Sequence, residues 1–73
     1  MIQPDTIQSA IEDGLPCEHV QVTGDGHHFE AVIVSAQFRG KTRVQQHQMI
    51  NAAFGTDLGT VLHSLALQTR APD

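Results

Sequence analysis

Aromatic residues and cysteines are scarce in this chain. Its 73 residues contain no Trp, no Tyr, three Phe and one cysteine, Cys17. A single cysteine cannot form a disulfide within these residues, which excludes a disulfide-stapled secreted module. With little aromatic area, a core must be built mainly from aliphatic side chains in tightly layered helices and strands. A chain of this size buries only about 60% of its unfolded surface, so we expect one small domain, residues 1–73, with a stability of about 5 kcal/mol.

Basic residues and long apolar runs are also few. Four Lys and Arg stand against eight Asp and Glu, and the formal net charge is -4. Tight, sequence-blind binding of nucleic acid needs a basic footprint, which this balance argues against. Three of the basic residues still form a local patch: Arg39, Lys41 and Arg43. There is no run of about 18 apolar residues, and MIQPDTIQSA lacks the segments of a signal peptide, so we expect a cytoplasmic protein without membrane contact.

The stretch over residues 28–54 contains the clearest structural pattern. Residues 28–35 alternate as a strand, and a break at 38–41 contains Gly40, which permits a sharp turn. Thr42 is the predicted N-cap of a helix over Arg43–Phe54. The predicted apolar faces are Phe29, Ala31 and Ile33 on the strand and Met49, Ile50, Ala53 and Phe54 on the helix. This strand and helix supply most of the large apolar side chains for a core.

The flanking segments complete an α+β pattern. Residues 4–14 predict an amphipathic helix, residues 19–23 a strand, and residues 62–69 a third strand. Gly24-Asp25-Gly26 predicts a turn, because Asp can bond its own backbone and glycine tolerates positive φ. Residues 56–60 are either one helical turn or a loop. The economical arrangement is a three-stranded sheet with helices packed on one face, in which the third strand can lie beside the first. Periodicity does not determine which strands are parallel.

Four stretches in a fixed order resemble one family. They are residues 24–29, 34–41, 43–53 and 62–69, with Pro72 after the last, and together they cover nearly the whole chain. In this combination the sequence resembles the BolA family. The resemblance implies an αββααβ fold related to class II KH domains. It also implies pairing with a monothiol glutaredoxin around a bridging [2Fe-2S] cluster, with a role in iron-sulfur trafficking or iron regulation. Some members have been viewed as DNA-binding regulators. Relative to the family, the segment after Ala53 is shorter and richer in glycine.

The resemblance implies metal ligands at two positions. His63 matches the C-terminal ligand, and a second ligand belongs to the loop between the first two strands. Many members have Cys or His in that loop. The Cys-type position falls on Asp25 here, and a carboxylate suits iron-sulfur chemistry poorly compared with thiolate or imidazole. His27 is therefore the predicted loop ligand and His28 its alternative. The two are not expected to bind one metal together, because successive side chains diverge.

The other candidate residues are given structural roles. Cys17 lies outside the family's ligand positions and is read as a small buried hydrophobe. His47 is predicted to be a partly buried, hydrogen-bonded residue of the central helix, and His19 a solvated strand residue. The isolated protein is not expected to bind a cluster, since the remaining ligands would come from a glutaredoxin cysteine and its glutathione. We expect His63→Ala to impair the mixed cluster more than His27→Ala, because a strand holds His63 in place.

The function predicted from the sequence is a non-enzymatic binding module. No nucleophile-base set is implied, and Gly40-Lys41-Thr42 lacks the earlier glycine of a P-loop. The alternative is a KH-like nucleic-acid-binding regulator that uses Arg39, Lys41 and Arg43. Against it, no GxxG clamp is present, because Gly55 and Gly59 are one residue too far apart. A homodimer formed through an unprotected sheet edge is a further possible state.

Overall fold

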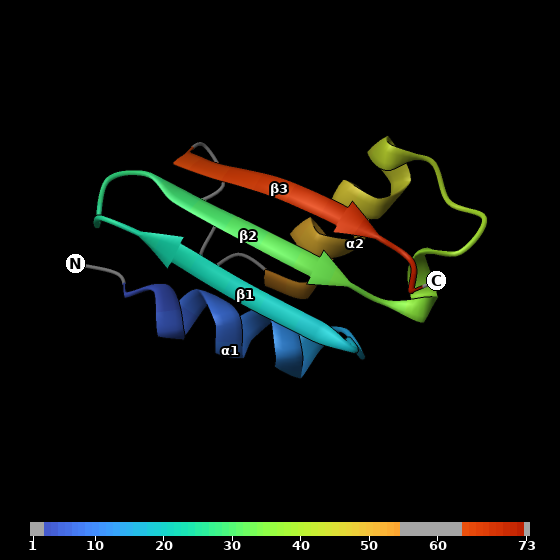
Figure 1. Ribbon diagram of the computed structural model, residues 1–73, viewed down its shortest axis with the longest axis horizontal. Helices are drawn as coiled ribbons and strands as arrows, with labels where there is room; N and C mark the ends of the chain where they lie inside the picture. Colours follow the sequence, from blue (N-terminus) through green and yellow to red (C-terminus); the bar gives the residue numbers. More distant parts are fainter. Residues whose placement is uncertain (1–2, 55–63, 73) are drawn as a thin grey trace.

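The computed structural model describes residues 3–54 and 64–72. Its elements are α1 (Pro4–Gly14), β1 (His19–Gly24), β2 (Phe29–Val34), the 3-10 turn η1 (Ala36–Phe38), α2 (Arg43–Phe54) and β3 (Leu65–Arg70). Figure 1 shows the three strands side by side, with both helices behind the same face of the sheet. The predicted α+β layering is therefore confirmed. The relationship to class II KH domains stays a prediction.

The position of β3 differs from the prediction. The strand order is β1-β2-β3, so the third strand lies beside the second and not beside the first. β1 pairs with β2 in an antiparallel hairpin, and β3 pairs with β2 in parallel, with Phe29 opposite Leu65. The α2 crossover returns the chain to the free edge of β2. This order pairs both edges of β2, the strand with the most buried residues.

The core lies between the sheet and the two helices. The buried apolar residues that pack together are Ile7, Ile11, Leu15, Val22, Phe29, Ala31, Ile33, Phe38, Ile50 and Phe54. The predicted apolar faces of β2 and α2 are confirmed by this set and by the partly buried Met49 and Ala53 packed against it. Phe38 is the exception, because the sequence suggested only a turn there, whereas its side chain is 1% exposed.

Local hydrogen bonds explain where α2 begins. The amide of Gln45 donates to Thr42 Oγ1 at 3.1 Å, and the amide of Thr42 donates to Gln45 Oε1 at 2.9 Å. This reciprocal pair is a capping box, and it confirms Thr42 as the N-cap. Gly40, just before it, has a φ of 74°, a left-handed conformation that favours glycine.

One predicted boundary needs correction, and two other predictions lie outside the described residues. The third strand was predicted over residues 62–69, but Ser64 lies in a short 3-10 segment and β3 begins at Leu65. Residues 56–60, predicted as either one helical turn or a loop, lie outside the described residues, and so does the predicted ligand His63. Within the described ranges, no helix has both the length and the apolar character needed to cross a membrane.

Candidate functional site

Asp25 organises the loop between β1 and β2. Its Oδ1 accepts hydrogen bonds from the amides of His27 and His28, each at 2.8 Å, and its own amide donates to the carbonyl of His28 at 3.2 Å. Gly26 has a φ of 95°, which lets the chain reverse inside this small loop. The predicted turn, with Asp bonding its own backbone, is confirmed. The side chains of His27 and His28 are both exposed.

The same hydrogen bonds act on the Asp25 carboxylate. The His28 amide and then the His27 amide hold the pKa of Asp25 below its ordinary range. Donors that bond the charged form favour it. The stabilisation they provide is therefore present above the pKa of the unfolded chain and is lost as the pH falls through the lower pKa of the folded loop.

We expect the loop to report this titration directly. The amide proton shifts of His27 and His28 should both follow one midpoint below the ordinary Asp value of about 3.9, measured by NMR over an acid titration. In Asp25→Asn the side-chain oxygen still accepts the bonds, so the loop should persist while the titration disappears. A midpoint at or above the ordinary value would contradict the geometry.

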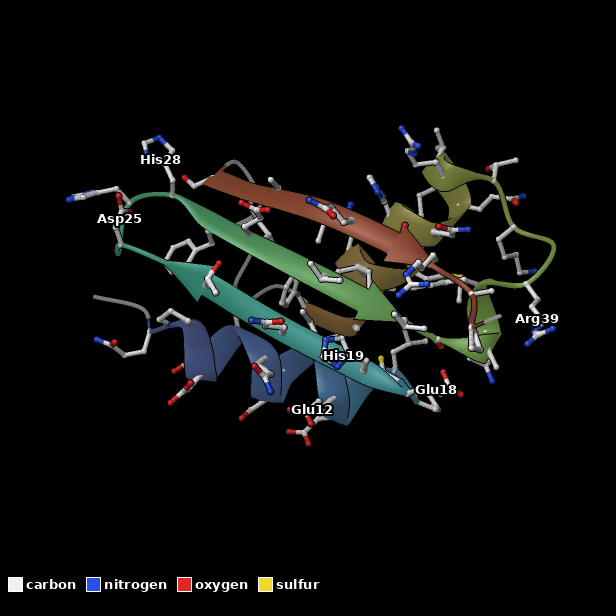
Figure 2. The ribbon with its side chains drawn as sticks, in the orientation of Figure 1. Glu12, Glu18, His19, Asp25, His28 and Arg39 are labelled. Atoms are coloured by element: carbon white, nitrogen blue, oxygen red, sulfur yellow. The ribbon has the colours of Figure 1, made fainter. Side chains whose placement is uncertain are left out.

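The loop borders a shallow depression at its end of the sheet. The depression has a volume of about 640 Å³ and is lined by the end of β1, the start of β2 and residues 64–66. Its lining includes His28 and Ser64, and Figure 2 shows Asp25 and His28 at this end of the molecule. Ser64 follows His63 directly in the sequence. Ser64, the neighbour of the predicted ligand His63 in the sequence, therefore lies in the same depression as the loop that contains the other predicted ligand, His27.

The described residues do not by themselves form a complete metal site. No group of three or more His, Cys, Asp or Glu side chains among them could hold a metal ion. The loop offers exposed imidazoles at His27 and His28, while the oxygen of Asp25 that faces the loop is engaged by amides. Imidazole is an accepted ligand in iron-sulfur centres. One imidazole of the loop can therefore act as a ligand to a metal group whose other ligands come from another molecule.

Cys17 lies at the other end of the sheet. It precedes β1, whereas the histidine loop follows β1, and six strand residues span about 20 Å. Its Sγ donates to the carbonyl of Leu15 at 3.1 Å, and the side chain packs partly buried against the core. Burial raises the pKa of the Cys17 thiol, and the carboxylates of Glu18 and Glu12 raise it further. A thiol held protonated is a poor nucleophile and ligand.

The basic patch also lies at the end opposite the histidine loop. Arg39, Lys41 and Arg43 are all exposed, and Arg39 donates to the carbonyl of Pro72 at 3.0 Å. Figure 2 shows Arg39 at the far end of the molecule from Asp25 and His28. The two sets of predicted site residues therefore form separate surfaces. One ligand of ordinary size cannot contact both.

The remaining histidines are placed largely as predicted. His19 is exposed on β1. His47 is partly buried on α2, but its Nε2 is buried and has no hydrogen-bond partner in the part of the chain that the structure describes. The prediction of a hydrogen bond is therefore wrong for that atom. Its side chain lines a hollow beside β3, together with Leu67 and Thr69 of that strand.

The fold and the loop define a small α+β protein of the BolA type. A family model described as BolA-like protein matches residues 4–73, and the chain belongs to this family. The solved structure of a BolA homologue from Coxiella burnetii superposes with a TM-score of 0.86 at 38% identity, covering 100% of this chain and 95% of that one. This likeness confirms the fold.

Curated relatives are similar over most of this chain but are longer. BolA-like protein 1 from Homo sapiens is 32% identical over 71 residues, which is 97% of this chain and 50% of that protein. The DNA-binding transcriptional regulator BolA from Haemophilus influenzae is 38% identical over 55 residues, or 75% of this chain and 53% of that protein. The chain thus spans about half the length of these relatives, whose names describe BolA-like proteins or a regulator and not enzymes.

Proposed function

We propose that this protein is a non-enzymatic partner of a monothiol glutaredoxin, with which it holds a bridging [2Fe-2S] cluster for iron-sulfur trafficking or iron regulation. His63 and one imidazole of the β1–β2 loop would be its ligands. A glutaredoxin cysteine and its glutathione would provide the others. The assignment of His63 rests on the family resemblance.

The observation that carries the proposal is the Asp25-ordered loop. Two hydrogen bonds of 2.8 Å, donated by the amides of His27 and His28 to Asp25, hold its backbone. Both imidazoles are exposed, and His28 lines the depression beside the start of β3. A loop whose backbone is already ordered loses less conformational freedom when its side chain binds a metal. An incomplete ligand set at an exposed rim suits a cluster shared between two proteins. It does not suit a cluster enclosed by one chain.

The proposal is tested by reconstitution. The protein is mixed with a monothiol glutaredoxin, glutathione, iron and sulfide, and the visible circular dichroism is recorded. We expect a heterodimer whose cluster spectrum differs from that of glutaredoxin alone, and no cluster on the isolated protein. A spectrum that does not change when this protein is added, together with no heterodimer in sedimentation, would reject the proposal.

Single alanine variants rank the ligands. We expect His63→Ala to reduce the cluster absorbance of the heterodimer more than His27→Ala, because His28 adjoins His27 and can replace it. His19→Ala is the matched control, since His19 is exposed but lies at the opposite end of β1. Each variant should keep its far-ultraviolet spectrum, because none of the predicted ligands belongs to the apolar core predicted from the sequence. Loss of the cluster with His27→Ala but not with His63→Ala would reverse the ranking.

Nucleic-acid binding is the second candidate function. It is favoured by the exposed Arg39, Lys41 and Arg43 around the start of α2 and by the relative from Haemophilus influenzae that is named a DNA-binding regulator. The net charge of -4 and the absence of Trp and Tyr weigh against it. Titration against DNA and RNA at low and moderate salt separates the two functions. Micromolar affinity that persists at moderate salt would place nucleic acid first.

A further inference from the structure

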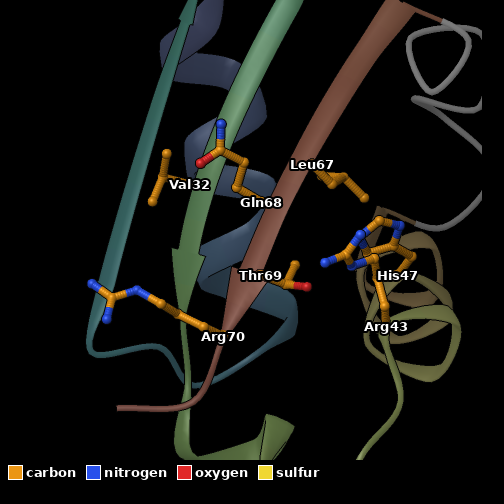
Figure 3. Close-up of a pocket in the computed structure, with 7 residues that line it drawn as sticks. All are labelled: Val32, Arg43, His47, Leu67, Gln68, Thr69 and Arg70. Atoms are coloured by element: carbon orange, nitrogen blue, oxygen red, sulfur yellow. The ribbon is translucent and has the colours of Figure 1, made fainter. Parts of the chain in front are cut away.

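β3 is an edge strand of the described sheet, and a hollow lies against it. In the described part of the chain it pairs with β2 alone. The hollow has a volume of about 400 Å³ and is lined by Val32, Arg43, His47, Leu67, Gln68, Thr69 and Arg70. We call it the β3-edge hollow. Four of its residues are consecutive in β3, and Figure 3 shows Arg43 and His47 approaching the strand from α2 on the side away from β2.

The direction of the backbone groups follows from one hydrogen bond. The carbonyl of Arg70 accepts from the amide of Ser35, at the end of β2, at 3.0 Å. The amide and carbonyl of one strand residue point to the same edge, and successive residues point to opposite edges. Gln68 therefore faces β2 like Arg70, and the backbone groups of Leu67 and Thr69 face the hollow. They form a template to which another strand can add.

The charged side chains that line the hollow, among the described residues, are both basic: Arg43 and Arg70. Arg43 is exposed on α2 and lies beside the outer edge, while Arg70 extends from β3 over the opposite face of the sheet. Among the residues that the structure describes, no carboxylate lines the hollow. Glu30, on β2, accepts a hydrogen bond from Gln68 at 3.2 Å and is outside the lining. In a protein of net charge -4, this edge favours an acidic occupant.

We propose that an extended acidic segment of a partner protein adds to β3 as a fourth strand. Backbone bonds to Leu67 and Thr69 would give affinity, and Arg43 would select carboxylate side chains. A second copy of this chain fits less well. Pairing β3 with itself would place Arg43 of both copies along one edge and would supply no carboxylate from the described lining to pair with them. This surface is separate from the histidine loop, so the proposal does not depend on the cluster.

A synthetic peptide tests the proposal without iron or glutaredoxin. The probe is an eight-residue peptide of alternating Glu and Val with blocked ends, and its control replaces every Glu with Gln. We expect saturable binding of the Glu peptide. At a free concentration of about ten times its Kd, hydrogen exchange of the Leu67 and Thr69 amides should slow about tenfold. The amides of Gln68 and Arg70, already bonded to β2, should change little.

Two variants show whether the peptide binds at the β3 edge or responds only to the overall charge of the protein. Arg43→Gln should raise the Kd of the Glu peptide about threefold to fivefold, the effect of one partly exposed ion pair. Lys41→Gln removes the same charge outside the hollow and should change the Kd less than about twofold. Three results would overturn the proposal: no binding at about 1 mM peptide, equal binding of the Gln peptide, or a dimer of the protein alone with Leu67 and Thr69 already protected.

Discussion

Replacing Phe38 with alanine is expected to lower the free energy of unfolding by about 3–5 kcal/mol. Phe38 ends the η1 turn and is only 1% exposed, so its ring is among the largest fully buried side chains. Removing it sacrifices the buried area and leaves a cavity beneath the chain reversal before α2. Since a domain of this size has a stability of about 5 kcal/mol, about 3–50% of the Phe38→Ala protein should be unfolded at 25 °C. Urea denaturation followed by far-ultraviolet circular dichroism measures the change.

Two further variants show that the loss comes from the cavity. Phe38→Leu keeps most of the apolar volume and should cost less than Phe38→Ala. Val44→Ala is the surface control, because Val44 is 66% exposed, and its stability should change by no more than about 0.5 kcal/mol. If Phe38→Ala and Val44→Ala unfold at the same urea concentration, the ring does not contribute to the core as described.

Gly14→Ala is expected to destabilise the protein by about 1–3 kcal/mol, although alanine is the better helix former. Gly14 is the last residue of α1. A Cβ there would lie 2.6 Å from the Cβ of Ala53, 2.8 Å from its Cα and 2.9 Å from its carbonyl oxygen. Two of these atoms are backbone, so α1 and α2 would have to move apart. In an exposed helix the same change would stabilise by about 1 kcal/mol, so the sign of the effect is informative.

A double variant tests this explanation. Ala53→Gly removes the nearest of the three atoms but leaves the other two. The double variant should therefore be more stable than the sum of the two single effects predicts, but it should regain only part of the stability lost in Gly14→Ala. Thermal unfolding of the four proteins in the cycle gives the coupling. A Gly14→Ala protein that is more stable than the parent would show that the helices are not packed this closely at Gly14.

Patterns of a few residues were enough to predict most of the elements and the loop that carries the candidate site. Alternation located β1 and β2, helical periodicity identified the buried faces of α1 and α2, and Thr42 marked the start of α2. The turn at Asp25, with His27 beside it, was also predictable. In each case the determining interactions join residues a few positions apart, so the sequence contains both partners within one window.

Contacts between distant segments required the tertiary structure. Phe38 looked like a turn residue because nothing near it in sequence reveals that the core lies beneath it. Gly14 is the last residue of the helix predicted over residues 4–14, but nothing near it in sequence shows that its small size is needed for the approach of Ala53. The pairing of β3 with β2, and hence the edge near Arg43, depends on the path of the α2 crossover. Local periodicity has no information about such paths, because they are decided by which surfaces bury one another.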